Sequence, residues 1–503
     1  MEQVIEGFFL SIQPSNIVGI LFGYTIGIII GSLPGLTGVM AIALILPLTY
    51  RLPGLFAIAS LMGCYKGATY GGSISAILLN TPGTPEAAAT ALDGYPLAQK
   101  GEGRRALEMA LMASVIGGTI SNLVLIVVAK PLALIALKFG PAEITALIFF
   151  SLTIVVVTIG NSLLEIVKGL TSAGVGLFFA MVGLDIITTT RRYCFGILEL
   201  DRGFNLVPVL IGLLALSEIL IQLEKLGKTN LEKSNSILNK LYQKKVTWQT
   251  RRNDLITWSK DIIKSSFIGT FIGALPGIGA TTAAFISYGE AKRSSKDRKN
   301  FGSGKIEGIA APESGNNAVC ASSLIPLVTL GIPGSITAAV LLGAFMIHGM
   351  MPGPMLMRTH PSILYGLFFL MIWTDPIGAI VIAIPYLHLA RLAIRRINKI
   401  ILFPLIIMLC IIGAYAIQFS IFDIKVMIFL GILGYLMKKN GFDIPAFLIA
   451  FILGPILENN TRIALSITNG NPIIFLKSPI AMVFFGLSII SLIWSSKIKN
   501  IKK

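Results

Sequence analysis

Long apolar stretches separated by short polar turns dominate the chain from end to end. Runs of roughly 20 apolar residues cross the ~30 Å hydrocarbon core of a bilayer as helices. Such runs fall at residues 16–33, 36–50, 55–80, 107–129, 132–160, 163–183, 206–223, 262–289, 308–347, 362–389, 401–417, 421–437, 442–457 and 473–496. Several of them are too short or too rich in glycine to be simple spans. The pattern therefore predicts an all-α polytopic integral membrane protein with about 11–14 membrane segments.

The amino-acid composition agrees with this prediction. Hydrophobic residues make up 54% of the chain and charged residues 13%, about half the charged share of an ordinary soluble domain. A net charge of +17 would suggest nucleic acid as the partner of a soluble protein. Here the basic residues stand mainly in loops between apolar runs, as the positive-inside rule requires. We therefore expect the lipid bilayer, and no nucleic acid, to surround the chain.

Two pairs of proline-glycine breaks recur in the two halves of the chain. Residues 31–38 read GSLPGLTG and residues 273–280 read GALPGIGA, while NTPGT at 80–84 corresponds to GIPGS at 331–335. Matching breaks in the same order indicate an internal duplication. We expect four regions: a first membrane repeat at 1–223, a basic cytoplasmic linker at 224–260, a second membrane repeat at 261–496 and a basic cytoplasmic tail at 497–503.

The charges of the loops predict how the two repeats are oriented. In the first half, Arg51 alone follows the LPG segment, while Lys100, Arg104 and Arg105 follow the second break. In the second half the order reverses, with six basic residues between 292 and 305 and a single arginine, at 358, later. Because basic loops face the cytoplasm, the pattern favours inverted-topology repeats, which are typical of secondary transporters. A parallel repeat with irregular loop charge is the alternative.

The breaks are candidate binding sites, because irregular backbone at membrane depth is tolerated only inside protein or along a cavity. New helix N-termini offer N–H groups that suit a carboxylate, and freed carbonyls suit a cation. Helix kinks with packing roles are the alternative. The substrate-binding candidates are Ser73, Asn80, Thr81, Pro82, Gly83, Thr84, Asn316, Asn317, Thr329, Pro333, Gly334 and Ser335. The candidates for holding a coupling cation are Gly35, Thr37, Gly277, Thr281 and Glu313.

Charged residues inside apolar sequence are a sharper signal, since each costs about 2.5–3.5 kcal/mol at the centre of the bilayer. Lys66 is a candidate partner for a substrate carboxylate, or it extends to the membrane surface. We interpret Glu313 as a group that pairs with a cation or takes a proton. Glu86 and Asp93 are expected to face water, and Asp375 is assigned to the end of a span.

Enzyme and metal signatures are missing from the sequence. The GSGK string at 302–305 is flanked by Lys299 and Ile306, where a phosphate-binding loop requires glycine and a hydroxyl residue. No HExxH or GxSxG motif occurs, and the four cysteines are scattered without a pairing pattern. We predict no catalytic residue, no metal site and no cofactor, only a coupling ion, Na+ or H+. A passive anion channel, or an intramembrane enzyme using Glu313 with Asn316 and Asn317, is the alternative.

Several strings resemble one known family. GSLPGLTGVMAIALILPLTY from residue 31, LDGYP at 92–96 and APESGNNA at 311–318 are similar to the large membrane subunit of tripartite tricarboxylate transporters, the TctA family. The resemblance runs in order along residues 5–495.

The resemblance implies a secondary transporter subunit in a bacterial inner membrane, driven by an ion gradient. Its expected work is symport of a small carboxylate, citrate or a related anion, by elevator-like alternating access. It also implies two protein partners, a periplasmic solute-binding protein and a small membrane subunit. Lys66, Thr69 and Ser73 stand in a stretch that varies in the family, so the identity of the carboxylate is not implied.

Overall fold

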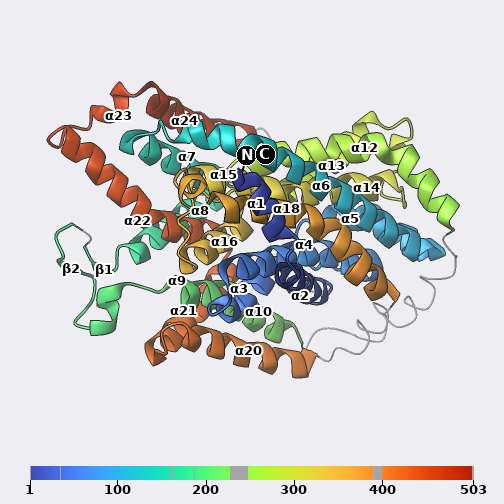
Figure 1. Cartoon of the computed structure of the whole chain (residues 1–503), viewed down its shortest axis with the longest axis horizontal. Helices are drawn as coiled ribbons and strands as arrows, with labels where there is room; N and C mark the ends of the chain where they lie inside the picture. Colours follow the sequence, from blue (N-terminus) through green and yellow to red (C-terminus); the bar gives the residue numbers. More distant parts are fainter. Residues whose placement is uncertain are drawn as a thin grey trace.

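Helices form nearly all of the computed structural model, which describes residues 2–33, 35–159, 162–185, 187–226, 247–388 and 399–500 (Figure 1). The helices up to residue 226 are α1 (Glu2–Ser11), α2 (Pro14–Gly31), α3 (Gly38–Thr49), α4 (Gly54–Leu79), α5 (Ala87–Leu97), α6 (Gly103–Ala136), α7 (Pro141–Ile159), α8 (Leu163–Ala180), α9 (Leu206–Leu210) and α10 (Ser217–Leu226). The later helices are α12 (Trp248–Ala274), α13 (Gly279–Ser294), α14 (Glu307–Ser322), α15 (Leu324–Leu330), α16 (Ile336–Ile347), α17 (Leu356–Thr359), α18 (Pro361–Gly378), α20 (Lys399–Ala416), α21 (Ile421–Lys439), α22 (Ile444–Ile467), α23 (Ile474–Lys477) and α24 (Pro479–Asn500). Strands β1 (Gly183–Leu184) and β2 (Arg191–Arg192) pair as an antiparallel hairpin.

The outer surface is that of a membrane protein. Seven helical segments of the described chain are long and apolar enough to span a bilayer, and four shorter apolar helices accompany them. Large apolar side chains point outward, including Val127, Phe271 and Ile421, which are 71%, 69% and 67% exposed. Apolar surface on this scale requires lipid around it. The predicted all-α, multi-pass membrane class is confirmed.

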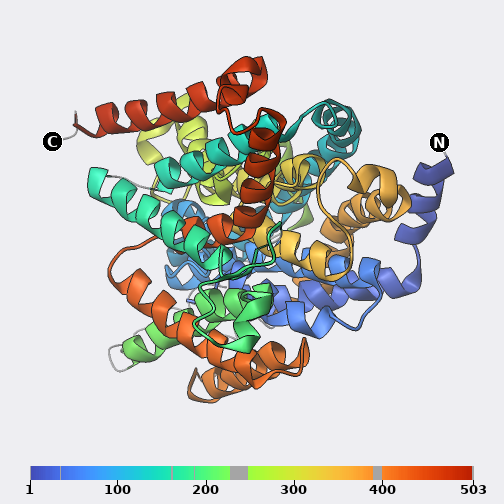
Figure 2. The same ribbon diagram turned by 90° about the vertical axis from the view of Figure 1, so that its left-hand side faces the viewer.

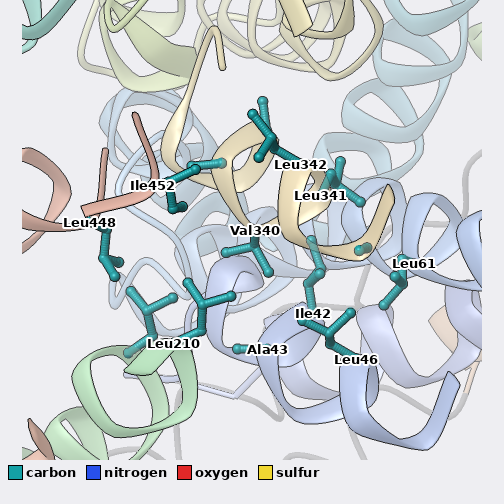
Figure 3. Packing of buried hydrophobic residues seen from close by; sticks show 14 of the residues in the cluster. Ile42, Ala43, Leu46, Leu61, Leu210, Val340, Leu341, Leu342, Leu448 and Ile452 are labelled. Atoms are coloured by element: carbon teal, nitrogen blue, oxygen red, sulfur yellow. The ribbon is translucent and has the colours of Figure 1, made fainter. Parts of the chain in front are cut away.

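The apolar core is built around α16. Val340, Leu341 and Leu342 of this helix are buried, and Figure 3 shows them between α3, which carries Ile42 and Leu46, and α22. Because α3 and α16 come from different halves of the chain, the two halves share one core.

Small residues bring α2 and α4 into close backbone contact. A Cβ atom on Gly27 of α2 would lie 2.2 Å from the carbonyl oxygen of Cys64 on α4. A Cβ on Gly67 of α4 would lie 2.4 Å from the carbonyl oxygen of Tyr24. Lipid supplies little hydrophobic drive between helices, so close van der Waals packing of small residues holds such pairs together.

The right and left ends of the molecule in Figure 1 differ in the segments that they carry. One end, at the right of Figure 1, holds the far ends of α5 and α12. There Lys100 donates a hydrogen bond of 2.6 Å to the carbonyl of Ser303, and Arg105 pairs with Asp254 at 2.6 Å. The basic loops after residue 97 and after residue 294 therefore meet at this end, which we call the basic end. The inverted relation of the repeats stays a prediction.

The opposite end carries the hairpin, which faces the viewer in Figure 2. Arg192 of β2 pairs with Glu458 of α22 at 2.6 Å, and Arg462 of α22 pairs with Asp185 at 2.8 Å. The Arg462 guanidinium holds the pKa of the Asp185 carboxyl well below its usual range. These ion pairs fasten the hairpin to a membrane helix.

The boundaries of the predicted linker do not coincide with the boundaries of the neighbouring helices. Helix α10 continues to Leu226, and α12 begins at Trp248, inside the segment 224–260 that the sequence assigned to the linker. Residues 227–246 of that segment, and residues 501–503 of the predicted tail, lie outside the described residues.

Candidate functional site

The proline-glycine break at residues 80–84 folds back on α4, the helix that precedes it. Helix α4 ends because Asn80 adopts a left-handed conformation, with φ of 52°, and the amide of Thr81 bonds the carbonyl of Ser75 at 3.4 Å. The amide of Gly83 then bonds the carbonyl of Gly72 at 3.2 Å. A Cβ on Gly83 would lie 1.9 Å from the carbonyl oxygen of Gly31. The break therefore lies against the C-terminal end of α2.

The second half repeats this arrangement. Gly331 ends α15 with φ of 73°, and the amide of Ile332 bonds the carbonyl of Pro326 at 3.3 Å. The amide of Gly277, in the second LPG turn, bonds the carbonyl of Gly334 at 3.1 Å. Ser335 then caps α16 by accepting a hydrogen bond of 3.1 Å from the amide of Ala338. In each half, the two breaks lie together.

A buried polar seam joins α4 of the first half to α14 of the second. Tyr65, Thr69 and Ser73 recur every four residues on α4, so they share one face of that helix. Ser73 contacts Glu313 and Thr69 contacts Cys320, at 2.5 and 3.6 Å. The two helices therefore run antiparallel along the seam. Tyr65, at its other end, lies near Ser335 and Thr337 at the N-terminus of α16.

Glu313 is the centre of this seam and is fully buried. Its Oε1 accepts hydrogen bonds of 2.5 Å from Ser73 of α4 and Thr90 of α5, and its Oε2 accepts one of 3.0 Å from Ser114 of α6. Asn317 donates to Ser114 at 2.9 Å. Within the described chain, no lysine, arginine or histidine forms an ion pair with Glu313. We call Glu313 with its three hydroxyl partners the Glu313 cluster.

The chemistry of the Glu313 cluster suits a small cation or a proton. A carboxylate and hydroxyl groups are the hard oxygen ligands that Na+ accepts, and a lone carboxylate also accepts a proton. A buried carboxylate without a counter-charge is strongly disfavoured, and either ligand would remove that penalty. Two nearby buried side-chain atoms lack a hydrogen-bond partner among the described residues: Nδ2 of Asn316, on α14, and Oγ of Ser323, which directly follows α14.

A second buried charge lies nearby and is neutralised by the protein itself. The Lys66 amine pairs with Asp375 of α18 at 2.5 Å and donates to the carbonyl of Met371 at 2.9 Å. Asn122 of α6 donates to the same two groups, at 3.0 Å and 2.8 Å. A Cβ on Gly118 would lie 2.5 Å from the Asp375 carboxylate, so the small residue makes room for it.

Sequence comparison with known families matches residues 17–449 to the Tripartite tricarboxylate transporter TctA family. The chain belongs to the TctA family. It is a membrane component of a tripartite transporter system, as the sequence predicted.

Curated relatives of this TctA-family chain come from Agrobacterium vitis. The "Uncharacterized 52.8 kDa protein in TAR-I ttuC' 3'region" is 36% identical over 475 residues, which cover 94% of this chain and 92% of the relative. The "Uncharacterized protein in TAR-II ttuC' 3'region" is 38% identical over 225 residues, 45% of this chain and 92% of the relative. No solved structure matches the chain.

The predicted substrate residues of this TctA-family chain divide into two groups. Ser73, Asn316, Asn317 and Ser335 line the buried seam, and Thr84 is buried at the start of the turn into α5. The others lie in the breaks or bond their own helix. Asn80 caps α4, Thr81 is exposed and Pro82 is half-buried. Thr329 donates to the carbonyl of Ile325. The buried turn residues are Gly83, Pro333 and Gly334. Lys66 lies against Asp375, so its charge is already balanced.

The predicted cation residues are also separated. Glu313 lies in the seam, whereas Gly35 contacts Gln222 of α10 and Gly277 contacts Val155 of α7. Thr37 caps α3 by accepting a hydrogen bond of 3.3 Å from the amide of Met40, and Thr281 is half-buried on α13. Among the described residues, no side-chain hydrogen bond joins these turns to Glu313. Whether any of them binds an ion stays a prediction.

The sequence reasoning missed several residues that the fold brings to buried sites. Thr90 and Ser114 complete the Glu313 cluster, but an isolated hydroxyl in an apolar helix gives no signal of its partner. Asp375 was assigned to a span end and is buried within α18, with only 5% exposure. Asp93 was expected to face water and is fully buried. The expectation for these two aspartates was wrong because partners from distant segments enclose them.

Proposed function

We propose that this TctA-family chain is the large transmembrane subunit of a secondary transporter that imports a small carboxylate, a tricarboxylate or a related organic anion. The transporter lies in a bacterial inner membrane. A periplasmic solute-binding protein delivers the anion, and a small membrane subunit completes the assembly. Family membership and the multi-pass fold support this proposal. The tripartite character of the family supports the two partners.

The observation that carries the proposal is the Glu313 cluster, a buried carboxylate ringed by hydroxyls at the junction of the two halves. Uptake of an anion against an inside-negative potential needs a compensating positive charge, worth about 2.3 kcal/mol per charge per 100 mV. We assign the coupling ion, Na+ or H+, to this cluster. Its binding would remove the carboxylate charge before the substrate enters the same seam.

The anion has a complementary place at the other end of the seam. Helix α16 begins there with Ser335 as its cap, and Tyr65 adds a hydroxyl. Peptide dipoles and N–H groups at a helix N-terminus favour negative charge. We propose that the substrate carboxylate binds between this terminus and two polar atoms that lack a hydrogen-bond partner among the described residues, Oγ of Ser323 and Nδ2 of Asn316. Elevator-like movement of the seam would then carry both ligands across.

The test is uptake by proteoliposomes that hold the complete transporter, with substrate-loaded binding protein outside and imposed Na+ or pH gradients. Glu313→Gln should lower the accumulation ratio by about 50-fold at 100 mV, because one coupled charge is lost. Counterflow of labelled for unlabelled carboxylate needs no net charge movement and should continue. Glu2→Gln, at an exposed site in α1, is the matched control and should accumulate substrate normally.

The outcomes separate the alternatives. Normal accumulation by Glu313→Gln contradicts the assignment of the coupling ion. Downhill flux without accumulation in the wild-type protein indicates a passive channel. An intramembrane enzyme would show neither, and would instead convert the added carboxylate.

A further inference from the structure

A third buried carboxylate fastens a loop at the basic end of the molecule. Oδ1 of Asp93, on α5, accepts hydrogen bonds from the backbone amides of Gly302, Gly304 and Lys305 at 2.9, 2.8 and 2.8 Å. Its Oδ2 accepts one of 2.9 Å from the hydroxyl of Tyr288, on α13. We call Asp93, Tyr288 and the loop 302–305 the clasp. It joins α5 of the first half to the loop between α13 and α14 of the second.

Peptide dipoles, rather than a basic side chain, balance the charge of Asp93. The amine of Lys305 pairs with Asp297 instead. Gly302 and Gly304 take φ of 88° and 105°, and this backbone turns successive N–H groups toward one anion. A Cβ on Gly308 would lie 2.2 Å from Asp93 Oδ2, so that glycine leaves the carboxylate its space. Such a contact opens reversibly, because water satisfies both the carboxylate and the amides once they part.

Helix α5 connects the clasp to the Glu313 cluster. Thr90, which donates to Glu313 at 2.5 Å, precedes Asp93 by one helical turn. The loop 302–305 leads directly into α14, which carries Glu313. Glu313 follows Glu307 by six positions on α14, which is about 9 Å along the helix. Helices α5 and α14 are therefore fastened twice, once in the seam and once at the basic end.

We propose that the clasp is the gate that closes the basic end of the path from the Glu313 cluster, and that α5 couples its opening to occupancy of that cluster. A cation or proton at Glu313 neutralises the carboxylate, and a hydrogen bond to a neutralised carboxyl is weaker than one to a bare carboxylate. The hydrogen bond from Thr90 is then weakened, α5 is held less firmly at the cluster, and the clasp opens. This inference rests on the proposed transport function, since a gate acts only in a carrier.

Cross-linking tests whether the clasp must open. Lys100 and Ser303 are both exposed, and the Lys100 amine touches the Ser303 carbonyl. A chain with Lys100→Cys and Ser303→Cys, treated with a short bifunctional methanethiosulfonate, should lose uptake by about tenfold or more, because a locked gate stops the cycle. Reduction with dithiothreitol should restore it, and each single variant should keep uptake. A cross-linked chain that still transports would overturn the proposal.

A labelling measurement tests whether Asp93 limits access to the seam, and it requires no transport assay. Cys320 is buried in the seam beside Thr69, and the reporter chain has alanine in place of Cys64, Cys194 and Cys410. In inside-out vesicles, Asp93→Ala should increase the rate of Cys320 modification by a small methanethiosulfonate about fivefold or more, if the clasp limits access. Asp93→Asn, which keeps the volume and an acceptor oxygen, should give a smaller increase.

Failure of the gate proposal and failure of the proposed transport function give different results. An unchanged Cys320 rate in both Asp93 variants overturns the gate, whatever the transport result. A faster Cys320 rate in a complete transporter that takes up no carboxylate overturns the proposed function, and leaves the clasp as a barrier at the basic end.

Discussion

Three buried carboxylates of this molecule are balanced in three different ways. Hydroxyls surround Glu313, peptide N–H groups surround Asp93, and a lysine pairs with Asp375. The ion pair of Lys66 and Asp375 is the most enclosed, with side chains 2% and 6% exposed. Removing one member of such a pair leaves an uncompensated charge, whereas removing both leaves apolar packing. The pair therefore joins α4 to α18, and neither residue is replaceable alone.

Lys66→Met should destabilise the protein by about 3–5 kcal/mol, because Asp375 then stays buried without its partner. Adding Asp375→Leu to Lys66→Met should recover most of that loss. Thermal melting of the purified protein in detergent measures both effects. Lys138→Met, at an exposed position, is the control and should melt like the wild type. A double variant that melts no higher than Lys66→Met would contradict this account of the pair.

At the scale of helices, the site depends on the positions at which helices end. Left-handed residues end α4 at Asn80 and α15 at Gly331, and glycine-lined contacts hold α2 against α4. The broken ends are stable because neighbouring backbone supplies their hydrogen bonds. Since Gly83 lies against the last turn of α2, any separation of α2 from α4 also moves the break at residues 80–84.

Gly27→Ala should lower stability by about 1–3 kcal/mol, because its methyl group meets the Cys64 carbonyl and α2 has to shift. Substrate affinity should fall with it, as the break moves with α2. Gly174→Ala on α8 is the matched control, since no atom lies within 4 Å of its Cβ position; it should change stability by less than about 1 kcal/mol. Melting temperature and ligand-dependent melting give both readouts. Equal effects at the two glycines would refute the packing argument.

The whole molecule has two chemically different ends. The clasp and the basic loops lie at one, and the hairpin of β1 and β2 lies at the other (Figure 1). From the positive-inside rule we expect the basic end to face the cytoplasm. We then expect the hairpin, which ion pairs fasten to α22, to face the periplasm, the side from which a binding protein would approach.

In intact cells, a membrane-impermeant maleimide should therefore label Phe195→Cys in the hairpin and should not label Ser303→Cys. Phe195 is 80% exposed and Ser303 is also exposed, so access to reagent alone decides the result. The native cysteines are all buried and contribute little background. Opening the membrane should make Ser303→Cys reactive, which serves as the internal control. Labelling of Ser303→Cys before that step would reverse the assigned orientation.

The sequence alone determined the class of protein and the positions of its helix breaks. An apolar run of membrane length can be recognised from the local sequence alone. A chain with so many of these runs can bury them only by placing them in a bilayer. The breaks at Gly35, Gly83, Gly277 and Gly334 were equally readable, because proline and glycine end helices through their own backbone. The importance of Glu313 could also be predicted from the sequence, since an acidic side chain in a membrane-spanning segment costs free energy.

Only the tertiary structure decided which polar groups meet. Glu313 bonds Ser73, Thr90 and Ser114 across separations of about 200 residues or more, and Asp93 is enclosed by a loop from the other half. The cost of burying a carboxylate depends on the donors around it rather than on its own neighbours in the chain. Local sequence reports that a charge needs a partner, whereas helix packing determines which partner it receives.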